Sequence, residues 1–316
     1  MLKEVYAQHL NRNVKFGRTP PVAVGPRLHF ARYAVSLPTP AATCSYSSKA
    51  LAALRDVMGN DRLGDCVIAG LFGHSLAVFT GNAGALYHTA LPDIIKWYSA
   101  IGGYNPKDPS TDRGCDEETA LNYAVKTGFP NGTKASGWVV VDATNKTQVM
   151  QALELFETVV LGMALPDEWI SPFPANDSAV WDVAGAPNPE NGHCVVIVGY
   201  NAAGVQIATW GLIITLTWAA LKKYAVSHAG GEAYALLTPD LIGKGQTKAA
   251  SGFDWAGLLA DFNAFGGNVP VPKASPTLAQ FQAWANAGIA AKYHAGMTAK
   301  EAEAAASAGI AANAPL

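Results

Sequence analysis

The stretch Asn191-Gly192-His193-Cys194-Val195-Val196-Ile197-Val198-Gly199-Tyr200 decides the fold of this chain. Five consecutive apolar residues follow His193, so the stretch predicts a buried strand with a histidine at its entrance. A buried imidazole needs a hydrogen-bonding partner, because its burial otherwise costs free energy. Alone, such a histidine is more often a satisfied core side chain than a catalytic group. The stretch therefore predicts a central strand and makes His193 a candidate site residue.

A second stretch, Asn60-Asp61-Arg62-Leu63-Gly64-Asp65, runs into Cys66. Gly64 and Asp65 predict a turn, and the apolar pattern from Cys66 to Phe79 predicts a buried helix after it. A thiol attacks as the thiolate, and both a helix N-terminus and a neighbouring imidazolium lower its pKa. Without such a neighbour, a free cysteine is usually a small buried side chain. Cys66 is therefore a candidate nucleophile if the fold brings His193 beside it.

The bulk composition indicates a globular chain with a large core. It has 316 residues, of which 50% are apolar and 15% are charged. A net charge of −2 gives no reason to expect binding to nucleic acid or to a membrane surface. The chain opens without an apolar run of signal length, and no window approaches the roughly 18 apolar residues of a membrane span. We expect a cytoplasmic protein, or part of a particle assembled inside the cell.

The cysteines and acidic residues do not suggest a metal site. Cys44, Cys66, Cys115 and Cys194 form no Cys-x-x-Cys pair and have no zinc-ligand spacing, which predicts free thiols in a reducing compartment. An acidic cluster lacks the spacing of a calcium loop, so we expect a solvated face with a helix cap and no metal or other cofactor. This cluster comprises Asp108, Asp112, Asp116, Glu117 and Glu118.

Three parts are expected along the chain. Residues 1–46 contain prolines that interrupt regular structure, which predicts an extended arm over a surface. Residues 47–240 should form the main domain. Residues 241–316 should form an extension, in which a stiff linker at 268–272 precedes helices with capping boxes at Thr277/Gln280 and Thr298/Glu301. The arm and the extension could also contact neighbouring subunits, including further copies of this chain.

Within the main domain, helical patterns come first and strand patterns follow, which predicts an α+β fold rather than a wound parallel sheet. The predicted helices cover residues 47–58 and 66–79, one that ends at 102–103, one that begins at 116, and one between 141 and 159. The predicted strands cover residues 138–141, 159–163, 194–200, 205–210 and 233–237, with a hairpin loop at 201–204.

The order and spacing of five segments over about residues 47–238 resemble the papain-like cysteine peptidase family. Asn60 stands six residues before Cys66, where that family has a glutamine. Gly114-Cys115 precedes a helical pattern that ends near Gly128, and residues 148–163 match the helix and Val-rich strand that come next. The stretch 192–200 fits the pattern Gly-His-x-Val-x-x-Val-Gly-Tyr, and Ala208-Thr209-Trp210-Gly211 stands in register with Asn-Ser-Trp-Gly.

The resemblance implies a papain-like fold and a thiol hydrolase that needs no cofactor. Cys66 would be the nucleophile and His193 the general base and then acid. Asn60 and the backbone N–H of Cys66 would form the oxyanion hole, with Asp65 and Trp210 lining the site. The implied reaction is the hydrolysis of a peptide or amide through a thioester.

Departures from the family pattern leave a second reading open. Ala208 stands where the family's asparagine orients the imidazole, and Asn60 is one methylene shorter than glutamine. Val67 replaces a tryptophan, and Leu63 replaces a half-cystine, which leaves Cys115 free. The chain could therefore keep the fold as a catalytically inactive structural or binding subunit of a larger assembly, such as a virus particle.

Overall fold

A computed structural model describes residues 2–20, 27–248, 252–265, 282–283, 285–287, 289 and 297–313. The chain divides into two compact units, Met1–Val269 and Pro270–Leu316. In the second unit, α12 (Ala299–Asn313) begins with the predicted capping box. The Glu301 carboxylate accepts from the backbone N–H of Thr298 at 2.8 Å, and the Thr298 hydroxyl accepts from that of Glu301 at 3.3 Å. The predicted linker at 268–272 and the predicted capping box at Thr277/Gln280 lie outside the described residues, and residues 282–283, 285–287 and 289, which follow them, are helical.

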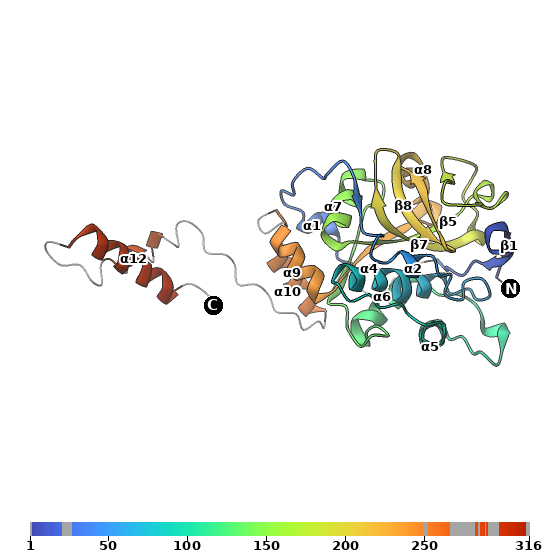
Figure 1. The fold of residues 1–316 in the computed structure, drawn as a ribbon, viewed down its shortest axis with the longest axis horizontal. Coiled ribbons are helices and arrows are strands. Elements are labelled where there is room, and N and C mark those ends of the chain that lie inside the picture. Colours follow the sequence, from blue (N-terminus) through green and yellow to red (C-terminus); the bar gives the residue numbers. More distant parts are fainter. Residues whose placement is uncertain are drawn as a thin grey trace. The chain divides into compact units, whose positions relative to one another are not determined.

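The first unit is built on one sheet with helices against it (Figure 1). Its strands, in spatial order, are β4 (Gly137–Val140), β10 (Glu232–Leu237), β5 (Val159–Ala164), β7 (Gly192–Tyr200), β8 (Gly204–Thr209), β9 (Leu212–Thr217) and β6 (Val180–Trp181), and β3 (Cys44–Ser45) also pairs with β7. All described pairs in this sheet are antiparallel except β6 with β9. All five predicted strands are therefore confirmed, as β4, β5, β7, β8 and β10, and the Asn201 loop joins β7 to β8 as predicted.

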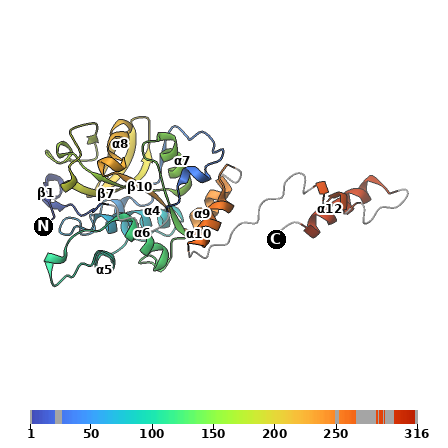
Figure 2. The same cartoon turned by 180° about the vertical axis from the view of Figure 1, so that it is seen from behind.

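Helices α4, α5 and α6 lie on one side of the strands, as two opposite views show (Figures 1 and 2). The α-helices of the first unit are α1 (Phe30–Tyr33), α2 (Leu51–Leu54), α3 (Cys66–Ile68), α4 (Leu76–Asn82), α5 (Leu91–Gly102), α6 (Glu117–Lys126), α7 (Lys146–Phe156), α8 (Trp218–Tyr224), α9 (Pro239–Lys248) and α10 (Trp255–Ala264). Short 3-10 turns are η1 (Gln8–Leu10), η3 (Pro109–Thr111), η4 (Asp167–Trp169), η5 (Pro189–Asn191) and η6 (Ser227–Ala229).

The helix that begins at Cys66 is continuous to Asn82, which confirms the predicted helix. Its middle part, η2 (Ala69–Ser75), is π-helical and was not predicted. The prediction of a helix over 47–58 was wrong in length. Only α2 forms there, and Met58 takes a left-handed backbone with φ of 52°, which a helix cannot contain.

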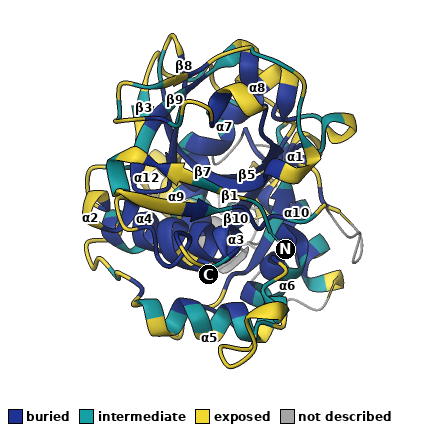
Figure 3. Ribbon diagram, turned by 90° about the vertical axis from the view of Figure 1, so that its right-hand side faces the viewer, coloured by how far each residue is buried: buried dark blue, intermediate teal, exposed yellow. Residues whose placement is uncertain are grey.

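Two apolar cores lie on the two faces of the sheet. One contains the helix begun by Cys66 together with Cys194, Val196 and Ala208. The other contains Val195 and Ile197 together with buried residues of α7 and α10. Since successive side chains of a strand point to opposite faces, β7 supplies alternate residues to both cores. All nine residues of β7 are buried, so the strand is central, and Figure 3 shows buried residues on the strands and mostly intermediate or exposed ones along α5.

The N-terminal arm is more regular than predicted. β1 (Glu4–Ala7) and β2 (Arg12–Lys15) pair as an antiparallel hairpin, so the expectation of irregular structure throughout this segment was wrong. After the hairpin, the chain runs inward, and Phe16 and Arg18 are buried rather than spread on a surface.

Candidate active site

Cys66 lies at the start of the central helix, against the strand that carries His193. The backbone of Cys194 forms a hydrogen bond with the Cys66 thiol. The fold thus brings Cys66, the predicted nucleophile, against Cys194, the residue that follows the predicted base His193. Cys66 and His193 are 127 positions apart in the sequence. This juxtaposition follows from α3 packing on β7.

The thiol of Cys66 is enclosed and stays protonated at neutral pH. Its residue is 2% exposed. Burial raises the pKa of the thiol to about 12, the Cys194 backbone lowers it, and the nearby carboxyl groups of Glu117 and Asp65 raise it further. The thiolate that a nucleophile requires is therefore suppressed in this conformation.

The imidazole of His193 is held by a hydroxyl and an indole. Its Nε2 lies 2.8 Å from Oγ1 of Thr209, and its ring stacks on Trp210 with centroids 3.6 Å apart and planes 7° apart. Its Nδ1 is buried and makes no hydrogen bond among the described residues. Burial lowers the pKa of the ring well below its usual value, and the neighbouring His74 lowers it further. The imidazole is neutral, and no hydrogen bond joins it to the Cys66 thiol.

The residue that orients His193 is Thr209, one position after the expected Ala208. Ala208 is paired with Val196, so its side chain points with Val196 and Cys194 into the helical core. Strand alternation puts Thr209 on the opposite face, where His193 lies. The motif alignment had placed a methyl group where the ring needs a partner. The pleat of β8 supplies the hydroxyl of Thr209, and alternation from His193 was the signal that could have identified it.

The side chain of Asn60, expected in the oxyanion hole, has both amide hydrogens occupied. Its Nδ2 donates to the carbonyl of Lys15 at 3.0 Å and to that of Leu63 at 2.9 Å. One bond holds the turn before Cys66, and the other holds the arm. Asn60 therefore binds a backbone carbonyl of this chain rather than standing open.

The carboxyl group of Asp65 is fully buried beside Cys66. Neither of its oxygens makes a hydrogen bond among the described residues. Burial raises the pKa of this carboxyl well above its usual range. Burial therefore favours the protonated form of Asp65.

The arm residues Lys15–Thr19, which we call the crossing segment, run through this site. The carbonyl of Gly192 accepts from the backbone N–H of Gly17 at 3.2 Å and of Arg18 at 3.1 Å. On the other side, Cys115 donates to the carbonyl of Gly17 at 3.0 Å and accepts from Thr19 at 3.1 Å. The segment is thus bonded to the residue before His193 and to the loop before α6.

Phe16 and Gly17 of the crossing segment fill the space between the His193 side of the sheet and the turn before Cys66. The Phe16 ring meets the His193 ring edge-on at 6.1 Å and the Trp210 ring at 5.3 Å. A Cβ on Gly17 would lie 2.0 Å from the carbonyl oxygen of Gly64, so only glycine fits there. The crossing segment is therefore packed tightly over the turn that positions Cys66.

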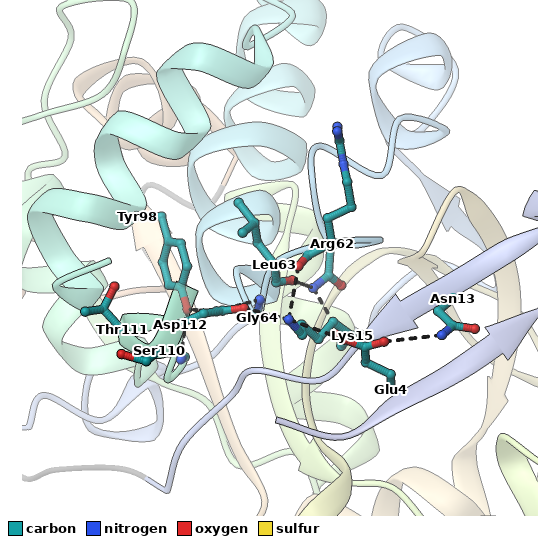
Figure 4. Close-up of polar contacts among 12 residues, drawn as sticks. Glu4, Asn13, Lys15, Arg62, Leu63, Gly64, Tyr98, Ser110, Thr111 and Asp112 are labelled. Atoms are coloured by element: carbon teal, nitrogen blue, oxygen red, sulfur yellow. Dashed lines mark hydrogen bonds and ion pairs between the residues drawn. The ribbon is translucent and has the colours of Figure 1, made fainter. Parts of the chain in front are cut away.

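Lys15 fastens the near end of the crossing segment (Figure 4). Its Nζ donates to Asp112 at 2.9 Å and to the Arg62 carbonyl at 3.1 Å. The other oxygen of Asp112 accepts from the backbone N–H of Gly64 at 3.0 Å and from the hydroxyl of Tyr98 at 2.7 Å. Burial lowers the pKa of Lys15, but Asp112 and Glu4 outweigh it and raise the value. One carboxylate thus joins the arm, the Cys66 turn and α5.

The acidic cluster is not a solvated face. Asp116, Glu117 and Glu118 are buried, so that prediction was wrong for these three residues. The predicted cap is confirmed, since the Asp116 carboxylate accepts from the N–H of Thr119 at 2.9 Å at the start of α6. The sequence pattern did not reveal the buried pair because the partners, Arg18 for Glu117 and Arg27 for Glu118, lie far away in the chain.

The described residues offer neither a disulfide nor a metal-ligand cluster beside this site. All four cysteines are unpaired. In the part of the chain that the structure describes, no three His, Cys, Asp or Glu side chains gather as a metal would need. Among those same residues, no helix is long and apolar enough to cross a membrane.

Comparison with known proteins identifies the fold. No family model matches the chain, and no curated protein sequence matches it. Among solved structures, xylellain, a cysteine protease from Xylella fastidiosa, matches with a TM-score of 0.50 and 12% identity over 75% of this chain and 98% of that one. Digestive procathepsin L 3 of Tenebrio molitor larval midgut has a TM-score of 0.46 and 15% identity over 74% of this chain and 75% of that one. A cysteine protease of Carica candamarcensis has a TM-score of 0.44 and 14% identity over 63% of this chain and 99% of that one.

The chain therefore has the α+β fold of papain-like cysteine proteases, as the sequence predicted. At this level of identity the likeness establishes the fold and leaves the chemistry to the site residues.

Proposed function

We propose that this chain is a papain-like cysteine hydrolase of peptides or amides, held closed by its own crossing segment. The observation that carries the proposal is the state of His193. Its Nε2 is held by Thr209 and its face is covered by Trp210, while its Nδ1 is left without a partner one residue from the contact between Cys66 and β7. A buried imidazole nitrogen without a partner costs free energy, so its presence calls for an explanation.

The proposed chemistry needs only residues of this chain. With the crossing segment displaced, Nδ1 of His193 takes the proton of Cys66, and the thiolate attacks the carbonyl carbon of the substrate. The backbone N–H of Cys66 and the Asn60 amide, released from Lys15, donate to the resulting oxyanion. The imidazolium protonates the leaving amine, and a water activated by His193 then hydrolyses the thioester. Thr209 keeps the ring oriented throughout.

Two features support displacement as the activating step. In the closed state the thiol is protonated, and Asn60 is already bonded to the Lys15 carbonyl. Both features are reversed when the crossing segment leaves, because water then reaches Cys66 and one amide hydrogen of Asn60 becomes free. The hydrolase is therefore latent rather than permanently impaired in this proposal.

The test is the rate at which a vinyl-sulfone probe labels Cys66, before and after limited proteolysis within the arm. Labelling should rise after cleavage, and His193→Ala should abolish the rise. Hydrolysis of amide substrates by the cleaved chain, lost in Cys66→Ala, completes the test. Cleavage that releases the arm without increasing Cys66 labelling would refute the hydrolase.

A second candidate is a catalytically inactive papain-like module that binds other subunits through its arm and its C-terminal extension. The raised pKa of Cys66 and the tight fit of Gly17 support it. In this case the crossing segment never leaves, and Cys66 fills the core. Cys66→Ala would then lower the free energy of unfolding without removing any activity, and sedimentation of the full chain would show a stable oligomer.

A further inference from the structure

Arg18 occupies a buried acidic pocket beside the candidate site. Its Nε donates to both carboxylate oxygens of Glu117 at 3.2 Å, and its Nη1 donates to the carbonyl of Gly230 at 2.6 Å. Its Nη2 pairs with Glu232. The side chain of Arg18 is only 3% exposed. Every nitrogen of the guanidinium therefore has an acceptor in a site closed to water.

The walls of this pocket belong to the main domain. Glu117 begins α6, Glu232 begins β10, and the floor is Gly162 of β5. A Cβ on Gly162 would lie 2.1 Å from Glu117 Oε1 and 2.7 Å from Arg18 Nε, so the glycine makes the room. The hydroxyl of Tyr234 lies 2.6 Å from the Glu232 carboxylate and helps to fix it. The arm supplies the occupant and none of these walls.

The pocket has a strong preference for a cation. Glu117 and Glu232 are both directed at the same guanidinium, and a neighbouring carboxylate, Glu118, is already paired with Arg27 at 2.5 Å. If Arg18 left, two carboxylates would face an enclosed space without a partner, which is costly. Burial and the neighbouring Glu232 favour a protonated Glu117, and Arg18 opposes this. A planar fork of N–H donors matches two carboxylates and a carbonyl better than an ammonium does.

The backbone of the crossing segment is held by hydrogen bonds next to the pocket. The carbonyl of Gly192 and the N–H and carbonyl of Cys115 hold the backbone of residues 17–19 in an extended form. These groups flank His193 and the helix of Cys66. A backbone held there passes the candidate nucleophile while its side chain enters the acidic pocket.

We infer that the pocket formed by Glu117, Glu232 and the Gly230 carbonyl is the recognition site for an arginine side chain of a peptide bound across Cys66 and His193. Arg18 fills it as an internal mimic. The inference rests on the proposed function, because it names the substrate class of that site as arginine-containing peptides.

The first experiment empties the pocket in the full-length chain. Arg18→Ala should lower the midpoint of thermal unfolding, and millimolar ethylguanidinium should restore part of the loss, whereas ethylammonium should restore less. The wild-type chain, whose pocket is filled, should not respond. Arg32→Ala is the matched control, because Arg32 also pairs with a carboxylate, Asp261 at 3.2 Å, but its side chain is 67% exposed. Equal responses of the Arg18 and Arg32 variants to ethylguanidinium would overturn the inference.

A second experiment does not require that variant to fold. Synthetic peptides with the sequence of residues 15–19, carrying either arginine or alanine at the position of Arg18, are added to the wild-type chain. Hydrogen exchange at the backbone amides of Gly17 and Thr19 reports displacement of the crossing segment. The arginine peptide should displace it at a concentration at least about tenfold lower than the alanine peptide, a ratio expected for charge-assisted hydrogen bonds. Equal potency of the two peptides would overturn the inference.

The binding and catalytic proposals fail separately. Both experiments are repeated in the Cys66→Ala background, where binding should be unchanged. Ethylguanidinium could restore the thermal stability of Arg18→Ala while Cys66 of the arm-cleaved wild type stays unreactive. That result would support the arginine pocket and refute the hydrolase. If the arm-cleaved chain hydrolyses arginine and alanine peptides with equal kcat/KM, the result supports the hydrolase and refutes the arginine pocket.

Discussion

Replacing Gly17 by alanine should open the candidate site. The added Cβ would lie 2.0 Å from the carbonyl oxygen of Gly64 and 2.4 Å from its Cα. Ordinary contacts between nonbonded carbon atoms are about 3.5–4.0 Å, so the crossing segment must move by about 1 Å or more. The obstacle is backbone, which a rotamer change cannot relieve.

The expected magnitude follows from the cost of overpacking. Such insertions cost about 1–3 kcal/mol, which increases the open fraction of the crossing segment by roughly 5- to 150-fold. Labelling of Cys66 by a thiol reagent, quantified by peptide mapping, should increase by a similar factor if opening limits it. Cys44, which is only partly buried, serves as the internal reference in each sample.

The control for this prediction is Gly243→Ala. A Cβ on Gly243, within α9, meets nothing within 4 Å, and alanine should stabilise the helix by about 0.5–1 kcal/mol without affecting Cys66. Thermal unfolding of both variants checks that the chain stays folded. A folded Gly17→Ala variant whose Cys66 reacts no faster than the wild type would show that the crossing segment does not gate this site.

Three further predictions concern the residues around the imidazole and the thiol. Thr209→Val leaves Nε2 of His193 unpaired and should lower the free energy of unfolding in urea by about 1–3 kcal/mol, whereas Thr209→Ser should lose less; equal losses would contradict the hydroxyl's role. Ala208→Asn places an amide in the apolar core with Val196 and should destabilise by about 1–3 kcal/mol without speeding Cys66 labelling, so faster labelling would mean that the residue reaches the ring after all. Labelling of Cys66 in the closed wild type should keep rising between about pH 8 and 11, because the thiolate is the reactive form and its pKa is raised to about 12, whereas a plateau near pH 8.5 would indicate an exposed thiol.

Local patterns in the sequence predicted the elements that carry the site. Alternation and apolar runs predicted β7 and β8, and helical spacing predicted the helix of Cys66 and α7, whose Val149, Leu153 and Phe156 are buried as expected. Gly103 ends α5 in a left-handed conformation with φ of 71°, as a glycine after an apolar helix predicts. These features depend on neighbours within a few residues, which a single sequence displays.

The order of segments also predicted the fold, because the spacing of several motifs constrains topology more than any one motif does. The partner of His193 was less predictable. A motif alignment pointed to Ala208, and only the register of β7 with β8 decided that the hydroxyl of Thr209 reaches the ring. A shift of one residue along a strand reverses the face of a side chain, so such an error changes the chemistry assigned to the site.

Alone, the sequence determined the helices and strands that carry the site, the two candidate reactive residues and the fold to which they belong. Tertiary structure decided that the arm enters the site, that Glu117 and Glu118 are buried, and that Cys66 is enclosed. The physical reason is range: Arg18 and Glu117 are 99 positions apart, and their charges meet only after the sheet and α6 have formed. Pattern along the chain encodes which faces are apolar, but the pairing of buried charges is a property of the assembled core.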